Sequence, residues 1–182
     1  MSIKNKKDTI SKYICAKDKN KSNLLKDVFT SDAKLDMELK TQNISFPSTT
    51  IGLNDINEVL ISKFNETYEN IYTFCINDSI QDIRNSLTCN WLVGMSEKEN
   101  KNIRIGCGKY YWYFDNEDNI LVNHLIITIE HMVILPKNYD TQISDWLQNI
   151  SYPWCDSKVI LENIPTIKSL KQIEIFIKNN KI

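Results

Sequence analysis

One stretch of the chain decides its fold: YICAKDKNKSNLLKDVFTSDAKLDM, residues 13–37. Apolar residues at helical spacing predict a first helix over about residues 8–17 and a second over 22–29. From residue 33 to residue 39 the period changes to two, because apolar and polar side chains alternate there as in a half-buried strand. The stretch therefore predicts helix, polar turn, helix and strand.

The chain after this opening reads as a third helix followed by strands. Pro47 interrupts pairing, because proline disfavours a strand interior, and Gly52 precedes a helix that Asn54 is expected to cap and that continues through Phe64. Strands are expected over residues 71–76, 87–95, 103–114 and 120–135, with a loop or helical turn at 78–84 and polar turns at 96–102 and 115–119. Helices followed by long strands indicate an α+β fold.

The pattern changes after Pro136. A short helix is expected over residues 143–150, followed by Tyr-Pro-Trp-Cys at 152–155 and a final amphipathic helix over 164–177. We therefore divide the chain into a main domain, residues 1–140, and a C-terminal helical extension, residues 141–182, packed on that domain.

Composition excludes several classes of function. The chain has 182 residues, 42% of them hydrophobic and 25% charged, and a net charge of −1. Such a balanced charge creates no field that would attract nucleic acid or an anionic membrane. The five cysteines show no Cys-x-x-Cys spacing, and no apolar run is long enough to cross a bilayer. We expect a soluble, cytoplasmic protein without a metal or a cofactor.

The order of elements over residues 8–135 resembles the nuclear transport factor 2-like superfamily, in particular its branch of SnoaL-like polyketide cyclases and ketosteroid isomerase. The local positions that carry the resemblance are Tyr13, Phe29, Asp32-Ala33, Gly52 and the aromatic strand 103–114. The Tyr-Pro-Trp-Cys tail is also similar to tails of some bacterial members. The resemblance implies a cone: a strongly bent mixed or antiparallel sheet wrapped around three N-terminal helices, here with a C-terminal helical extension.

Tyr13 matches the pocket tyrosine of that family, but Met37 stands where the isomerase carries its catalytic aspartate. A thioether cannot accept the proton that isomerisation must move. Asp36 is adjacent, yet one step along a strand turns a side chain to the opposite face. The isomerase mechanism therefore does not carry over, and Tyr13 is either a hydrogen-bond donor in the pocket or a core tyrosine bonded to the backbone.

Two histidines are the side chains expected to titrate near neutral pH. His124 shares a strand face with Thr128 and Glu130, which suggests a base and its partner, or alternatively a half-solvated face or a dimer contact. His131 lies on the opposite, aliphatic face. The resemblance implies that it lines the interior, as in family members with dehydratase or cyclase activity, and the alternative is a core histidine with its hydrogen bonds satisfied.

Aromatic residues supply further candidates for a ligand site. Residues 110–114 read Tyr-Tyr-Trp-Tyr-Phe, and Trp91 lies on the preceding strand. They suit either a flat ligand or a bent sheet packed on helices, and few basic residues accompany them as single-stranded nucleic acid would require. The predicted ligand-binding residues are Met37, Phe64, Trp91, Trp112 and Glu130.

Two functions follow from these features. The first is an apolar cavity for a small cyclic or aromatic molecule, with cofactor-free cyclisation, isomerisation or dehydration in which Tyr13 donates a hydrogen bond and His131 or His124 transfers a proton. The second is a non-catalytic binding module or a homodimer that meets through the Trp112 or Tyr111 face. In either case, the extension could also cover the cavity mouth.

Overall fold

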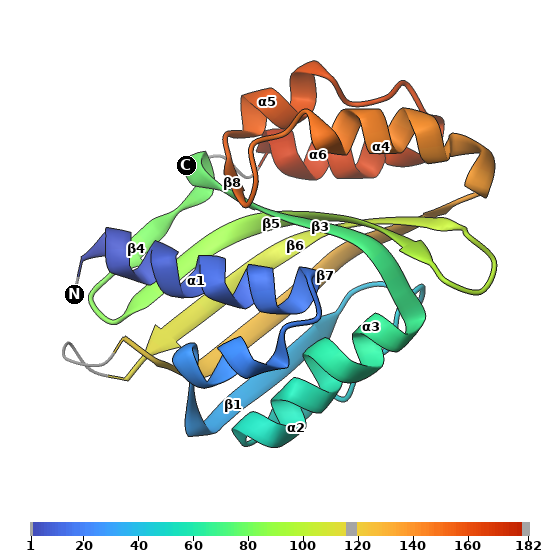
Figure 1. Cartoon of the computed structure of the whole chain (residues 1–182). Helices are drawn as coiled ribbons and strands as arrows, with labels where there is room; N and C mark the ends of the chain where they lie inside the picture. The colour runs from blue at the N-terminus through green and yellow to red at the C-terminus, as the bar shows by residue number, and fades with distance from the viewer. Residues whose placement is uncertain (1, 116–119, 180–182) are drawn as a thin grey trace.

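A curved mixed sheet organises the molecule, a computed structural model that describes residues 2–115 and 120–179 (Figure 1). The strands are β1 (Phe29–Leu39), β2 (Thr49–Ile51), β3 (Tyr68–Ile76), β4 (Gln81–Ile83), β5 (Ser86–Glu97), β6 (Ile103–Phe114), β7 (Val122–Leu135) and β8 (Trp154–Cys155). Over the described residues the sheet has the order β2-β1-β7-β6-β5-β3-β8, and β4 pairs with β5. The β1–β7 and β3–β8 pairs are parallel and the others antiparallel. The α+β fold and the bent mixed sheet predicted above are therefore confirmed.

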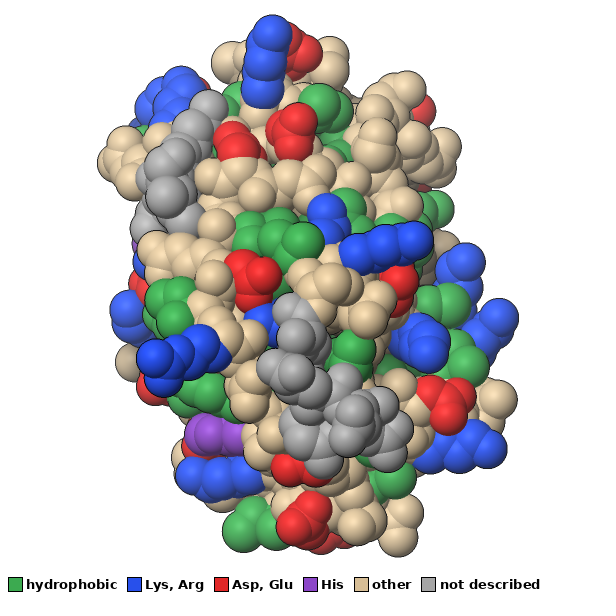
Figure 2. Space-filling view, turned by 90° about the vertical axis from the view of Figure 1, so that its left-hand side faces the viewer, with side chains coloured by type: hydrophobic (Ala, Val, Ile, Leu, Met, Phe, Trp, Pro, Cys, Tyr) green, Lys and Arg blue, Asp and Glu red, His purple; other side chains and the backbone are tan. Residues whose placement is uncertain are grey.

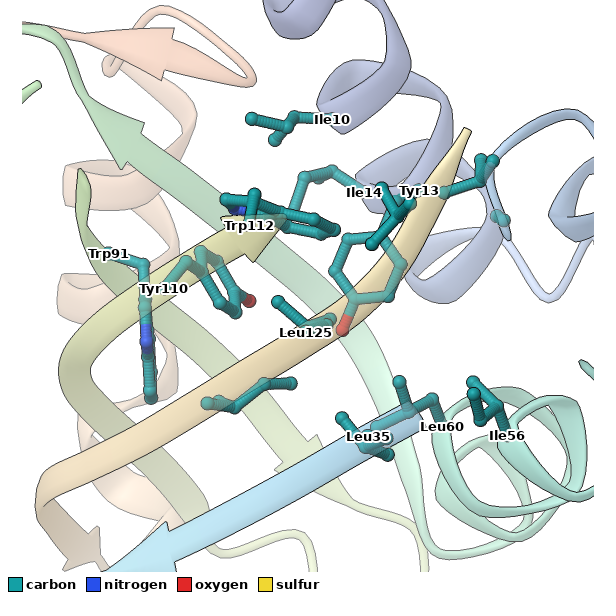
Figure 3. Close-up of a cluster of buried hydrophobic side chains, with 14 of the residues drawn as sticks. Ile10, Tyr13, Ile14, Leu35, Ile56, Leu60, Trp91, Tyr110, Trp112 and Leu125 are labelled. Carbon is teal, nitrogen blue, oxygen red and sulfur yellow. The ribbon is translucent and has the colours of Figure 1, made fainter. Parts of the chain in front are cut away.

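The N-terminal helices cover one face of this sheet, which we call the inner face (Figure 1). They are α1 (Ile3–Asp18), the 3₁₀ helix η1 (Ser22–Asp27) and a continuous helical segment made of α2 (Leu53–Asn57), the π-helical turn η2 (Glu58–Ser62) and α3 (Lys63–Thr67). Their apolar side chains meet those of β1 and β5–β7 in the larger hydrophobic core. Figure 3 shows Ile10, Tyr13 and Ile14 of α1 directed toward this core.

The C-terminal extension covers part of the opposite, outer face (Figure 1). It follows η4 (Lys137–Tyr139), begins within α4 (Asp140–Gln148) and contains α5 (Ser157–Glu162), η5 (Lys168–Leu170) and α6 (Lys171–Asn179), and it adds β8 to the sheet beside β3. Trp146, Ile173 and neighbouring side chains pack there on Leu92 and Ile105 in a second hydrophobic core. Gly94 permits the close approach, since a Cβ atom there would lie 2.2 Å from Leu147 Cδ1.

A β-bulge in β7 decides which side chains of that strand reach the inner face. Ile129 pairs with Gly108 and His131 with Cys107, so Glu130 is an additional residue on β7. A bulge inserts one residue and thereby inverts the alternation beyond it. Met132, rather than His131, consequently joins the inner core with Ile129.

Several element boundaries differ from the sequence predictions. The first helix begins at Ile3 rather than near residue 8, because Ser2 caps it by accepting a hydrogen bond from the Asn5 N–H. The second helix is a short 3₁₀ turn, and β1 starts at Phe29 rather than at residue 33. The segment 78–84 includes η3 (Asn77–Ser79) and the short strand β4.

The later boundaries also differ in part. The third helix begins directly after Gly52, which occupies a positive φ of 93°, so Asn54 is not its cap. The strands predicted at 103–114 and 120–135 match β6 and β7 closely, whereas α6 begins at Lys171 instead of residue 164. The turn predicted at 115–119 lies, apart from its first residue, outside the described residues.

The molecular surface carries mixed charge. Figure 2 shows Lys and Arg side chains interspersed with Asp and Glu over one face, in agreement with the net charge of −1. Within residues 2–115 and 120–179, no helix has the length and apolar character needed to span a membrane.

Candidate functional site

A small cavity of about 50 Å³ lies between the inner face of the sheet and the helices that cover it. Side chains from α1, the helical segment 53–67, the loop between β1 and β2, and five strands surround it. Its wall is almost entirely apolar, and its polar members are few. The lining residues are Tyr13, Lys17, Met37, Ile44, Phe46, Leu60, Phe64, Thr73, Trp91, Val93, Met95, Tyr110, Ile127, Ile129 and Met132.

Tyr13 contributes a hydroxyl group to this cavity. Its ring lies edge-on to Trp112, with the ring centroids 5.1 Å apart, and Figure 3 shows Tyr13 and Tyr110 with their hydroxyls in the same interior region. The buried Tyr13 hydroxyl has no hydrogen-bond partner among the described residues. Burial raises the pKa of Tyr13, as does the charge of Asp18, while the nearby Tyr110 side chain acts in the opposite direction. Tyr13 therefore stays protonated and keeps its O–H as a donor.

The Lys17 side chain forms the charged end of the cavity. Its Nζ atom donates hydrogen bonds to Asp18 Oδ1 at 2.5 Å and to Thr73 Oγ1 at 2.7 Å, and it lies 5.0 Å from the centre of the Phe64 ring. α1 ends at Asp18, so the last turn of this helix points a lysine and an aspartate toward β3. Both side chains are buried; that of Asp18 is only 1% exposed. A buried ion pair of this kind needs further hydrogen bonds to offset its desolvation.

Asp18 receives those hydrogen bonds. Its carboxylate accepts from the Thr73 backbone N–H at 2.7 Å, from Thr73 Oγ1 at 2.9 Å and from the Tyr152 hydroxyl at 3.2 Å, in addition to Lys17. The donors come from α1, β3 and the C-terminal extension. We call Lys17, Asp18, Thr73 and Tyr152 the polar cluster. The sequence predictions did not include it.

Methionines form a large part of the apolar wall. Met37, Met95 and Met132 line the cavity, which accounts for three of the four methionines in the chain. Gly106 makes room for one of them, because a Cβ atom there would lie 2.5 Å from Met132 Cε. An unbranched thioether side chain adapts its shape at low cost, so this wall can change its contour around a ligand.

The loop between β1 and β2 separates the cavity from a surface groove of about 310 Å³. Ile44, Phe46 and Phe64 line both spaces, and the Phe46 and Phe64 rings stack with centroids 6.3 Å apart. The loop is tied to the sheet, since Asn43 Nδ2 donates to the Met132 carbonyl at 2.6 Å and its own carbonyl accepts from Arg104. These three apolar side chains are therefore the partition that a ligand entering from the groove has to displace.

The structure places His131 outside the cavity, contrary to the expectation from strand alternation. The bulge at Glu130 turns His131 to the outer face, where its ring meets Phe176 of α6 edge-on with centroids 6.4 Å apart. Strict alternation along the sequence had assigned it to the same face as Ile129. A single extra residue reverses that assignment.

His124 also lies on the outer face, where it pairs with a different residue from the one predicted. Its Nε2 atom is 2.8 Å from Asp36 Oδ2, and its ring stacks on Tyr113. Thr128 donates to Glu38 at 3.0 Å, and Glu130 accepts from Lys40 at 2.8 Å. The three side chains predicted to act together therefore have separate partners: His124 and Thr128 contact residues of the parallel neighbour β1, and Glu130 contacts Lys40, which directly follows β1.

The carboxylate beside His124 is held in its ionised form. Burial alone raises the pKa of Asp36, but hydrogen bonds from Lys34, Thr49 and His124 outweigh that effect and lower it to about 2. We call Lys34, Asp36, Thr49 and His124 the outer cluster. It borders solvent and not the cavity, as the 21% exposed fraction of the Asp36 side chain shows.

The remaining predicted residues divide between the cavity and its surroundings. Met37, Phe64 and Trp91 line the cavity, and the Trp91 Nε1 atom is buried without a hydrogen-bond partner among the described residues. Trp112 is fully buried behind Tyr13 and does not line the cavity. The Glu130 carboxylate forms an ion pair with Lys40. Within the described residues, no three His, Cys, Asp or Glu side chains are grouped as a metal ion would need.

The chain resembles known proteins in fold but not in sequence. No protein-family model matches it, and no curated protein is similar to it in sequence. Solved structures are similar in fold. The LinA-type3 hexachlorocyclohexane dehydrochlorinase of Novosphingobium barchaimii is 13% identical, with a TM-score of 0.56 over 71% of this chain and 86% of its own.

Two further solved structures are similar to this chain in the same way. A nuclear transport factor 2-like protein of Burkholderia xenovorans is 13% identical, with a TM-score of 0.56 over 71% of this chain and 92% of its own. A nuclear transport factor 2-like superfamily protein of Salmonella enterica is 14% identical, with a TM-score of 0.54 over 68% of this chain and 87% of its own. The chain therefore has the fold of the nuclear transport factor 2-like proteins.

Proposed function

We propose that the chain binds a small, predominantly apolar molecule in the cavity, with Tyr13 donating a hydrogen bond to it. The observation that carries the proposal is the buried Tyr13 hydroxyl, which lacks a partner in an otherwise apolar wall. An unpaired buried hydroxyl costs about 1–3 kcal/mol, and a ligand atom that accepts its hydrogen bond removes that cost. The match of Tyr13 to the pocket tyrosine of the SnoaL-like branch also supports this site.

The cavity volume limits the ligand. At about 50 Å³ it is near one third of the roughly 150 Å³ of an engineered cavity that holds benzene. A molecule of a few non-hydrogen atoms fits directly. A five- or six-membered ring, as the sequence suggests, fits once Met37, Met95 or Met132 changes rotamer, which a methionine wall favours.

Catalysis is the second candidate, and similarity to a dehydrochlorinase of the same fold supports it. Cofactor-free elimination or isomerisation needs a base within reach of the substrate. Neither histidine lines the cavity, and Asp18 already accepts four hydrogen bonds. Because two donors already occupy each carboxylate oxygen of Asp18, neither oxygen is left to take a proton from a substrate, and we favour binding over catalysis.

A titration followed by ligand-observed NMR tests the binding proposal. Cyclopentanone is the probe, and two variants change the volume of the cavity in opposite directions. Met132→Ala enlarges it and should tighten binding, whereas Ile129→Phe fills it and should abolish binding. Ile134→Phe is the matched control, because Ile134 lies on the same strand but is 40% exposed. Equal affinity in all four proteins would show that the cavity is not the site.

Homodimer formation remains a separate proposal. At the end of the outer face near His124, Tyr113 is 40% exposed and Ile51 is 63% exposed. These two side chains lie on the sheet face that carries Tyr111 and Tyr113, not on the face where Trp112 is buried. Sedimentation velocity over a range of concentrations, with Tyr113→Glu as the comparison, tests it: a monomer at all concentrations would reject the dimer.

A further inference from the structure

We infer that the polar cluster is the recognition site for one class of ligand, a neutral carbonyl compound, and that Tyr152 of the C-terminal extension positions it. The inference rests on the proposed function, since it names the ligand of the same cavity. It depends on Lys17, Asp18, Thr73 and Tyr152, none of which the sequence patterns singled out.

Lys17 has one N–H group left for a ligand. A lysine ammonium group carries three donors. Among the described residues, its oxygen partners are Asp18 and Thr73, and the side chain lines the cavity beside Phe64. We infer that the third N–H is available on the cavity side, because Lys17 is one of the lining residues.

The other free polar atoms at the wall are also hydrogen-bond donors. Of the buried side-chain atoms without a partner in the described part of the chain, the Tyr13 hydroxyl and Trp91 Nε1 belong to cavity-lining residues. Thr73 Oγ1 accepts from Lys17 and donates to Asp18, so it is already used on both sides. The cavity thus presents N–H and O–H groups to an acceptor.

The charge of the polar cluster selects against anions. Asp18 lies directly against Lys17, and the two formal charges cancel. A carboxylate ligand would add an unbalanced negative charge to a buried site, which is costly, whereas a carbonyl oxygen accepts hydrogen bonds without adding charge. An alcohol brings a donor of its own, for which a tyrosine hydroxyl oxygen is the available side-chain acceptor at the wall. A ketone, aldehyde or ester meets the requirements best.

Tyr152 joins this site to the extension. Its hydroxyl donates to the second carboxylate oxygen of Asp18 at 3.2 Å, and its ring meets Phe74 edge-on. The segment is fixed to the sheet and to α1, because the Pro153 carbonyl accepts from the Cys75 N–H at 2.7 Å and Trp154 Nε1 donates to Ser11 Oγ at 2.9 Å. Tyr152 is therefore a positioning residue: it orients Asp18, and Asp18 orients Lys17.

The test compares two probes of nearly equal shape. Cyclopentanone carries a C=O group where methylenecyclopentane carries C=CH₂, so the ratio of their dissociation constants isolates the hydrogen bonds to oxygen. We expect wild type to bind the ketone at least about tenfold more tightly, the effect of one hydrogen bond from a charged donor. Cyclopentanecarboxylate should bind more weakly than the ketone.

Three variants locate the effect. Lys17→Met with Asp18→Asn removes both charges together, so no buried charge is left unpaired, and the preference should fall about tenfold. Tyr152→Phe keeps the ring and should lower the preference about threefold, while Tyr139→Phe, at a tyrosine just before the extension, should leave it unchanged. Circular dichroism confirms that each variant is folded.

The outcomes separate the two proposals. Equal binding of ketone and hydrocarbon by wild type would overturn the carbonyl inference and leave the cavity as a binding site. Tighter binding of the carboxylate would overturn it as well. An unchanged preference in both the double variant and Tyr152→Phe would remove the role of the polar cluster. If neither probe binds and Met132→Ala binds neither, the proposed function itself fails.

Discussion

Two clusters of similar chemistry lie on opposite faces of the same sheet. Each joins a lysine, an aspartate and a threonine: the polar cluster on the inner side has Lys17, Asp18 and Thr73, and the outer cluster has Lys34, Asp36 and Thr49. The aspartate side chain is 1% exposed in the first and 21% exposed in the second. The outer cluster also contains His124, which the sequence offered as one of two candidate proton-transfer groups.

The difference shows that residue type alone does not identify a site. Water screens the outer cluster, so its ion pair contributes little and a ligand gains little from it. The inner cluster adjoins an apolar cavity, where an unpaired donor is costly and a matching acceptor correspondingly valuable. This contrast is why the proposed binding site is at the cluster without a histidine.

The largest expected effect is on folding stability. Asp18→Asn should lower the free energy of unfolding by about 3–4 kcal/mol, because it leaves the buried Lys17 ammonium group without its counter-charge. Asp36→Asn should lower it by about 1 kcal/mol or less. Urea unfolding followed by circular dichroism measures both, and equal losses would contradict the contrast between the clusters.

Replacement of Tyr13 should change ligand affinity more than it changes the free energy of unfolding. Tyr13→Phe removes a buried hydroxyl without a partner, so unfolding free energy should stay the same or rise by up to about 1 kcal/mol. Affinity for cyclopentanone should fall about tenfold. Tyr152→Phe, which loses a real hydrogen bond, is the control and should be slightly destabilised. A large loss of stability in Tyr13→Phe would indicate a structural hydroxyl instead.

Acid should weaken the outer cluster in a defined pH range. The pKa of Asp36 is about 2 in the folded protein and near 3.8 in the unfolded chain, so its contribution is complete above about pH 5 and is lost as the pH falls through 2 toward 1. After allowance for screening by water, that contribution is about 1 kcal/mol. The difference in stability between wild type and Asp36→Asn should fall to a small fraction of its neutral-pH value at pH 2 and vanish near pH 1. A difference that persists there would show that ionisation of Asp36 is not its source.

The smallest expected effect is that of the histidines on binding. Replacement of His124 or His131 by Gln should leave the dissociation constant of cyclopentanone unchanged within about twofold, since neither side chain lines the cavity. The same titration used for Tyr13→Phe measures this. A tenfold loss in either variant would restore a histidine to the site.

Sequence patterns predicted much of the fold and part of the site. The strands β6 and β7 and the order of helices and strands follow from local periodicity, which is a property of neighbouring residues. Tyr13, Met37, Phe64 and Trp91 were also expected at the ligand site, and all four line the cavity. These positions sit on regular elements whose faces can be counted along the chain.

The remainder depends on contacts between distant segments. The bulge at Glu130 reverses the face of His131. Its one signal in the sequence is Gly108 on the neighbouring strand, where a Cβ atom would lie 1.8 Å from the Thr128 carbonyl oxygen. In the sequence, Lys17 and Asp18 are typical of a solvated helix end. The residues that bury them, Thr73 and Tyr152, are 55 and 134 residues away from Asp18 along the chain. A lysine and an aspartate completing the last turn of an apolar-faced helix were the one available signal.

The carbonyl carbon of bound, ¹³C-labelled cyclopentanone provides the most direct test of the account. Its chemical shift reports how strongly hydrogen bonds polarise the C=O bond. We predict a resonance at or beyond its position in water when wild type binds the ketone, and a return toward its position in alkane when Lys17→Met/Asp18→Asn or Tyr13→Phe binds it. An alkane-like shift in wild type would show that the ketone meets no donors in the cavity and would contradict the account.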